Sequence, residues 1–325
     1  MKKLHKTLLS ILVTSSMLNA QDMIGLDVGT WYMSWQQTSQ ASSMLKDKND
    51  ALNVNYNIDN SLAQVVKLNL NYSYLNAKIE YMNNTLTTSK EQTASSFNLG
   101  LTLLDLIPYI NVELRYVKAE FSGTMSATDN AGVDQNQAYG KGTFDADVDI
   151  ADVIIYPFNE YVGVGYRNYN YAFPQDVYIT HDESGESILS ALAHLKYEGY
   201  FYTIALDNQR LIDTISKYNG VVYTAMYGVG KLTPHTVSNA KVTKENAKLI
   251  DSYLGKNDAQ FIDIMVAYRY KQPKTKNFGY GLTVGYRYNK IQTEAGSKVN
   301  NDGYSIRTKF DTEFYGPFVG VEVSY

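Results

Sequence analysis

The sequence contains no cysteine among its 325 residues. Disulfides, cysteine-based metal sites and an amino-terminal lipid anchor on cysteine are therefore excluded. Long apolar runs are missing as well. After the first residues, no stretch approaches the roughly 18 uninterrupted apolar residues that mark a membrane-spanning helix. The chain is thus not expected to cross a membrane with helices.

The amino terminus resembles a cleavable secretory signal. Lys2, Lys3 and Lys6 form a positive segment, an apolar stretch follows over 8–18, and 18–20 ends in the small residue that a signal peptidase needs. The apolar stretch is too short to span a bilayer as a helix. We predict a signal peptide over 1–20 and a mature chain over 21–325. A soluble periplasmic protein is the simplest alternative for such an exported chain.

Charge and aromatic composition separate these alternatives. Without the three signal lysines the chain has 29 − 3 = 26 basic and 33 acidic residues, a net charge of 26 − 33 = −7. This acidic balance argues against a nucleic-acid partner. Tyrosine is abundant, at 29 residues against 11 Phe and 2 Trp. A soluble core disfavours so many hydroxyls, whereas the wall of a membrane barrel places tyrosine where hydrocarbon meets lipid headgroups.

Apolar and polar residues alternate with period two along much of the chain. Over 279–289 the even positions are Tyr, Leu, Val, Tyr and Tyr, while the odd positions are Gly, Thr, Arg and Asn. The same pattern occurs over 24–32, 66–72, 110–116, 162–167 and 262–270. A soluble sandwich strand also alternates, but glycines weaken an ordinary strand, and a sandwich would pack its aromatic face into the core.

The alternation predicts an all-β fold, a closed antiparallel transmembrane β-barrel of about 12 strands with long outer loops. The predicted strands are 24–36, 62–73, 76–87, 95–105, 108–122, 142–156, 160–172, 195–207, 219–231, 259–271, 278–292 and 304–325. Long outer loops are expected at 37–61, 123–141, 174–194 and 232–258, with loop helices over 187–195 and 243–254. A bundle helix is the alternative for these two segments. The connection 208–218 is longer than the short inner turn expected there.

The carboxyl terminus carries a specific pattern. Val319, Val321, Val323 and Tyr325 alternate with small or polar residues, and the chain stops on the aromatic. This ending resembles the terminal strand recognised by the assembly machinery of the Gram-negative outer membrane. With 316–320 and 285–288, it also resembles small proteobacterial outer-membrane barrels of uncharacterised function. The resemblance implies an outer-membrane location, with outer-membrane lipid, lipopolysaccharide and the assembly machinery as partners. It implies no activity.

Candidate catalytic residues are few. Three histidines follow the predicted signal, His181, His194 and His235, all in or beside predicted loops. The stretch 181–184 (His-Asp-Glu-Ser) holds the residue types of a hydrolytic triad. Neighbours in one loop do not give the geometry in which histidine takes the serine proton. Nor does the chain contain the motifs of outer-membrane phospholipase or of omptin proteases. We predict no catalytic residues and no enzyme.

One group of acidic residues could be considered as a metal site. Asp145, Asp147 and Asp149 share one face of a predicted strand at about 7 Å spacing. Calcium prefers oxygen ligands that converge from a tight loop, and three in line converge poorly. Zinc-binding spacings and phosphate-binding glycine loops are absent from the sequence. We therefore expect neither a metal nor a cofactor.

Charges predicted to line the lumen give the functional hypothesis. They are Asp27, Lys67, Glu113, Arg115, Asp145, Asp147, Asp149, Arg167, Asp263, Arg269 and Arg287. Such charges either line a water-filled pore or pair across it and seal it. The favoured interpretation is a narrow channel for small polar solutes or ions, with a modest cation preference from the three aspartates at 145, 147 and 149. A closed-lumen barrel for structure, adhesion or surface recognition is the alternative, and a barrel lipid hydrolase is less favoured.

Overall fold

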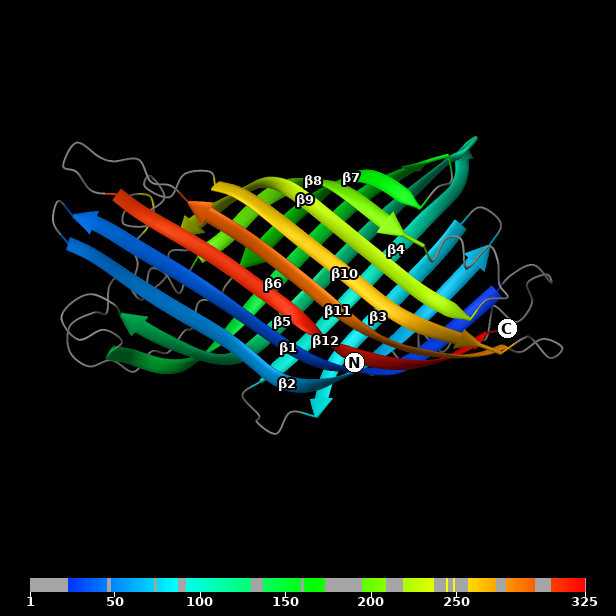
Figure 1. Cartoon of the computed structure of the whole chain (residues 1–325), viewed down its shortest axis with the longest axis horizontal. Coiled ribbons are helices and arrows are strands. Elements are labelled where there is room, and N and C mark those ends of the chain that lie inside the picture. Colours follow the sequence, from blue (N-terminus) through cyan, green and yellow to red (C-terminus); the bar gives the residue numbers. More distant parts are fainter. Residues whose placement is uncertain are drawn as a thin grey trace.

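The computed structural model describes residues 23–45, 48–72, 75–86, 92–129, 137–158, 161–172, 195–208, 219–236, 244, 248, 257–272, 279–295 and 305–324. Twelve strands make up almost all of this part (Figure 1). They are β1 Met23–Leu45, β2 Lys48–Tyr72, β3 Leu75–Leu86, β4 Thr93–Ile107, β5 Ile110–Asp129, β6 Gln137–Pro157, β7 Val162–Ala172, β8 Leu195–Asp207, β9 Gly220–Thr236, β10 Asn257–Lys271, β11 Gly279–Ala295 and β12 Ser305–Ser324.

The strands close into a single antiparallel barrel. Each pairs with its neighbours in the chain, and β1 pairs with β12 to complete the ring. In Figure 1 the blue β1 lies beside the red β12. The pair Gly25↔Ser324 brings the start of β1 next to the end of β12. We call this the basal end of the barrel, and the opposite end the distal end.

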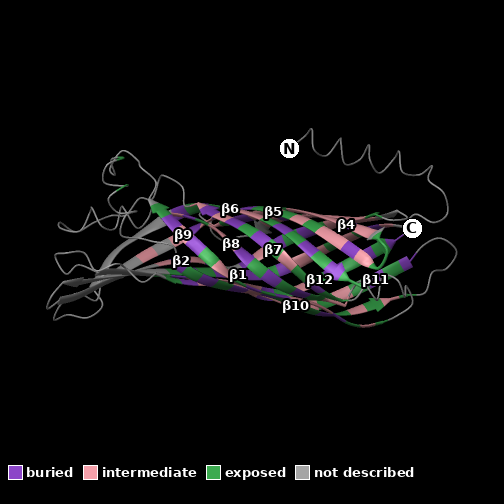
Figure 2. Ribbon diagram, turned by 90° about the horizontal axis from the view of Figure 1, so that it is seen from above, coloured by how far each residue is buried: buried purple, intermediate pink, exposed green. Residues whose placement is uncertain are grey.

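The two faces of the wall differ in character. Figure 2 shows buried and exposed residues alternating along the strands. Large apolar side chains such as Val28, Ile204 and Val284 point outward and are exposed, at 51%, 56% and 51%. Exposed aromatics border this apolar band on both sides. On the distal side they include Tyr32, Tyr81, Phe97, Tyr116, Tyr166 and Tyr227, and on the basal side Tyr109, Phe158, Tyr161, Tyr270 and Tyr280. An apolar band between two aromatic rims is the outer surface of a transmembrane β-barrel.

The ring contains fewer strands toward the distal end. The hairpin of β3 and β4 is short, and beyond it β2 pairs directly with β5, from Asn57↔Thr124 to Leu52↔Asp129. The ring there bypasses β3 and β4. Gly123 lies at this junction, where an added Cβ would come within 2.4 Å of the Asn57 carbonyl oxygen. A side chain at this position would push the two strands apart.

All twelve strands occur in the predicted order, but two predicted outer loops are wrong. Most of 37–61 belongs to β1 and β2, and much of 123–141 belongs to β5 and β6. These segments are polar in sequence, and their strands continue past the apolar band. Tyr325, the connection over 209–218 and most of the predicted helices lie outside the described residues. Of 243–254 the structure describes Lys244 and Lys248, both helical. Within the described chain, no helix is both long enough and apolar enough to cross a membrane.

Candidate functional site: the barrel interior

Aromatic side chains fill the interior of the distal half. We call this group the aromatic plug. It comprises Trp31, Trp35, Tyr56, Phe121, Phe144, Tyr169, Tyr171, Tyr197, Phe201, Phe261, Phe310 and Phe314, contributed by eight of the strands. Eleven of the twelve are buried, and Phe314 is partly buried against them. Because outward-facing residues of this wall are exposed, a buried side chain here lies inside the barrel.

The first half of the plug is a chain of rings from one side of the barrel. Trp35 stacks on Phe121 with ring centroids 5.6 Å apart, and its other neighbour, Phe144, is at 5.1 Å. Phe314 then contacts Phe121 at 5.8 Å and Trp31 at 4.6 Å, in edge-to-face geometry. These distances and angles are those of favourable aromatic pairs.

The second half comes mainly from β7, β8 and β10, with Phe310 added from β12. Tyr171 and Tyr197 contact Phe310 at 5.6 and 4.4 Å, while Phe201 contacts Phe261 at 5.0 Å. The Tyr171 hydroxyl donates a buried hydrogen bond of 2.6 Å to the Gln37 side-chain oxygen. Since Tyr171 is on β7 and Gln37 on β1, this bond ties the two sides together across the lumen.

Below the plug lies a buried ionic centre. Asp152 is 3% exposed and accepts hydrogen bonds from Arg115 Nε at 2.7 Å and from Arg167 Nε at 2.7 Å. Arg167 is itself 1% exposed, and its guanidinium lies 3.9 Å from the centre of the Phe261 ring. A cation over an aromatic face is stabilised by the ring quadrupole. The plug and the ionic centre are therefore in direct contact.

Ion pairs continue from this centre across the lumen. Asp263 on β10 lies 3.9 Å from Arg115 and 3.7 Å from Arg287. Arg287 on β11 reaches Glu80 on β3 at 3.9 Å, and Glu80 pairs with Lys67 at 3.3 Å. Together with Asp152 on β6, the paired residues come from six further strands: β2, β3, β5, β7, β10 and β11. Oppositely charged groups thus meet across the lumen.

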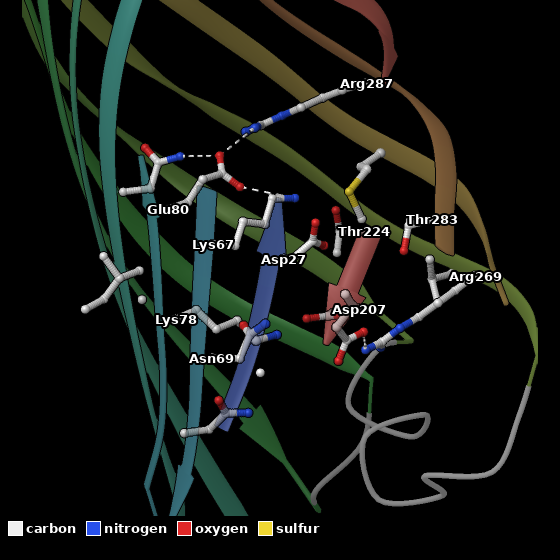
Figure 3. Close-up of a pocket in the computed structure, with 18 of the residues that line it drawn as sticks. Asp27, Lys67, Asn69, Lys78, Glu80, Asp207, Thr224, Arg269, Thr283 and Arg287 are labelled. Carbon is white, nitrogen blue, oxygen red and sulfur yellow. Dashed lines mark hydrogen bonds and ion pairs between the residues drawn. The ribbon is translucent and has the colours of Figure 1, made fainter. Parts of the chain in front are cut away.

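A cavity of about 280 Å³ occupies the basal half (Figure 3). Its cationic lining residues are Lys67, Lys78, Arg115, Arg269, Lys271 and Arg287, and its anionic ones are Asp27, Glu80, Glu113, Asp207, Asp263 and Glu322. The balance is 6 − 6 = 0, so the charged residues of the cavity wall carry no formal net charge. Glu322 pairs with Arg269 and, at 3.3 Å, with Lys271. Figure 3 shows Glu80 between Lys67 and Arg287. The side-chain amide of Asn98 also donates a hydrogen bond to Glu80.

The structure places most predicted lumen charges at this cavity. Asp27, Lys67, Glu113, Arg115, Asp263, Arg269 and Arg287 line it. Arg167 lies between the plug and Asp152. Val319, Val321 and Val323 of the predicted assembly signal face outward.

The prediction for three aspartates is wrong. Asp145 and Asp147 are exposed on the outer face of β6, and Asp149 accepts a hydrogen bond of 2.9 Å from Tyr116 on that face. The interior positions of β6 are the even-numbered ones, which include Phe144 and Asp152. These three aspartates therefore do not line the lumen, and the cation preference predicted from them has no basis in the structure. Asp152 was missed, although apolar Val153 and Ile155 beside it mark the even positions as the inner ones.

Groups of three or more His, Asp or Glu side chains placed to hold a metal ion are not found in the described part of the chain. His235 is exposed near the end of β9. His181 and His194 lie outside the described residues, so the predicted absence of a catalytic site stays a prediction.

Neither a protein-family profile nor a characterised protein matches the sequence. Several solved structures are similar in the course of the chain. The outer membrane protease OmpT from Escherichia coli has 9% identity and a TM-score of 0.39, over 96% of this chain and 100% of that one. The translocator domain of the autotransporter NalP from Neisseria meningitidis has 9% identity and a TM-score of 0.31, over 97% and 95%. A FadL homologue from Pseudomonas aeruginosa has 11% identity and a TM-score of 0.29, over 94% and 90%.

Proposed function

We propose that this protein is an outer-membrane β-barrel with a closed lumen, which serves a structural or surface-recognition role and is not a diffusion pore. The observation that carries the proposal is the aromatic plug. Twelve rings from eight strands pack together inside the distal half of the barrel. A solute crossing the barrel would have to displace them.

The free energy needed to open the aromatic plug supports a closed lumen. A large aromatic side chain buries at least about 150 Å². Exposing three rings of the plug to water would uncover about 450 Å², which costs roughly 11 kcal/mol at about 25 cal/mol per Å². The ionic series beneath the plug adds a second barrier, because separating a buried ion pair leaves uncompensated charge in a low-dielectric interior.

Location and partners belong to the same proposal. The outward apolar band with its two aromatic rims suits a lipid bilayer, and the terminal Val319, Val321, Val323 and Tyr325 fit the ending used by outer-membrane assembly. We therefore place the chain in the outer membrane, among outer-membrane lipid and lipopolysaccharide. The proposal assigns it no catalytic role.

Conductance measurements test the proposal. Purified protein inserted into planar bilayers is expected to give no steady current. A triple variant, Trp35→Ala with Phe121→Ala and Phe144→Ala, is expected to conduct, because it removes adjoining rings of the plug. A steady current through the unmodified protein would overturn the closed-lumen proposal and favour the narrow channel. If the triple variant inserts correctly but gives no current, the aromatic plug is not what blocks ion flow through the barrel.

A further inference from the structure

The basal cavity contains hydrogen-bonding groups that the barrel itself does not use. Asn98 donates its side-chain amide to Glu80 Oε1 at 2.8 Å, which fixes the orientation of the amide group. Its Oδ1 atom is then left buried, with no hydrogen-bond partner among the described residues. Because an unpaired buried acceptor is costly, this oxygen calls for a partner such as a water, an ion or a ligand.

Asp27 is a second uncommitted group. It is half-buried on β1 and lines the cavity, yet no cation of the described chain lies within 4.0 Å of its carboxylate. Lys67 and Arg269 act on it at longer range, and both are bound to other carboxylates, Glu80 and Glu322. The other acidic groups discussed above, at positions 80, 152, 263 and 322, each have a paired cation.

The registers of the strands bring these groups onto one wall. Asp27, Lys67, Glu80 and Asn98 are direct partners on β1, β2, β3 and β4. The next inward-facing row toward the basal end contains Ser324, Gly25, Asn69, Lys78 and Gly100. Ser324 is 2% exposed, and its hydroxyl lacks a hydrogen-bond partner in the described chain.

Two glycines leave space in front of this wall. A Cβ added at Gly100 would have its nearest neighbour at 3.8 Å, and one at Gly25 would have it at 3.5 Å. Neither glycine is therefore required by a close approach of the backbone. Their missing side chains enlarge the cavity, whose 280 Å³ equals roughly nine water molecules at about 30 Å³ each.

We propose that this cavity is a binding site for a small hydroxylated amine of about hexosamine size, taken up from the basal end. The Asp27 carboxylate receives the ammonium group, while Asn98 Oδ1 and the Ser324 hydroxyl hydrogen-bond to the ligand's hydroxyls. Five of the six cationic residues of the wall, Lys67, Arg115, Arg269, Lys271 and Arg287, are held in ion pairs. The buried amide oxygens of Asn76 and Asn98 have no partner among the described residues, and such acceptors favour a ligand rich in donors. The inference does not depend on a closed lumen, because the cavity lies on the basal side of the plug.

Calorimetric titration of the folded barrel in detergent micelles tests this assignment. Three probes share one ring size and differ in charge: D-glucosamine, D-glucose and D-glucuronate. D-Glucosamine is expected to bind saturably at one site, D-glucose at least tenfold more weakly, and D-glucuronate not measurably. Asp27→Asn is expected to weaken D-glucosamine binding at least tenfold. Gly100→Leu is expected to abolish it by filling the cavity.

Asp147→Asn is the matched control, since Asp147 is exposed on the outer face and its loss is expected to leave binding unchanged. Heat-modifiable migration on gels checks that each variant is folded. If the Asp27→Asn variant does not fold, D-glucosamine binding by the folded Gly100→Leu variant alone tests the proposal. The proposal is overturned if D-glucosamine gives no saturable heat, if D-glucuronate binds equally well, or if a folded Gly100→Leu variant binds like the unmodified protein.

Discussion

Replacing Asp152 with asparagine removes the carboxylate that Arg115 and Arg167 share inside the barrel. The substitution preserves size and shape, so packing changes little. Arg115 keeps a second acidic neighbour, Asp263, at 3.9 Å. Arg167 keeps the ring of Phe261, and its NH1 atom already has no hydrogen-bond partner among the described residues. The cost of the change therefore falls mainly on Arg167.

Removing one partner of a buried ion pair typically costs about 3–5 kcal/mol, because the remaining charge is left uncompensated. Both Asp152 and Arg167 have side chains only 1% exposed, so screening by water does little to reduce this value. We expect Asp152→Asn to lower the free energy of unfolding by about 3–5 kcal/mol. The double variant Asp152→Asn with Arg167→Met should lose less than Asp152→Asn alone, because the stranded cation is gone.

Equilibrium urea unfolding in phospholipid vesicles measures these differences. Both tryptophans of the chain, Trp31 and Trp35, belong to the plug, so their fluorescence reports on the distal interior. Asp147→Asn on the outer face of β6 serves as control and should change the free energy of unfolding by less than about 0.5 kcal/mol. Two outcomes would refute the reasoning: a loss below about 1 kcal/mol for Asp152→Asn, or strictly additive losses in the double variant.

Three other predictions address the wall and its assembly. Val284→Arg should destabilise the barrel by about 2–4 kcal/mol, because Val284 is exposed on the outer face that we assign to lipid. Thr283→Arg should destabilise it less, because Thr283 lines the cavity. Equal losses of stability for the two variants in a vesicle folding assay would contradict the assignment of the two faces. Deleting Tyr325 should leave unfolded protein in the periplasm, and normal heat-modifiable migration of the truncated chain in the outer membrane would contradict this. Gly123→Ala should slow folding and lower the free energy of unfolding by at least about 1 kcal/mol, because the added Cβ would clash with the Asn57 carbonyl oxygen. An unchanged urea midpoint would show that β2 and β5 can separate at this position.

Much of the architecture follows from local sequence. Outward residues such as Val284 and Tyr286 repeat every second position because successive strand residues face opposite sides. That period is a property of each strand alone, so strand order and strand number were predictable. Strand ends beyond the apolar band were not, because polar residues there resemble loop residues.

The partners inside the barrel could not be predicted from the sequence. Arg115 and Asp263 are far apart in the chain, and only ring closure and register bring them to 3.9 Å. The plug is equally non-local, since Trp35 meets Phe144 and Tyr171 meets Phe310 through the barrel interior. The sequence supplied the aromatic residues without indicating that several of them would face inward.

The three misplaced aspartates of β6 show where sequence reasoning stops. In the band of this strand, Val153 and Ile155 face outward and Asp152 faces inward. Toward the distal end the same inward positions are occupied by Phe144, Ala146 and Val148, and the outward ones by aspartates. The polarity of the two faces is thus reversed along one strand. The sequence by itself determined the alternation, because side-chain direction is local. Only the tertiary structure decided which face meets lipid, water or the plug, because that depends on the height of each residue in the closed ring.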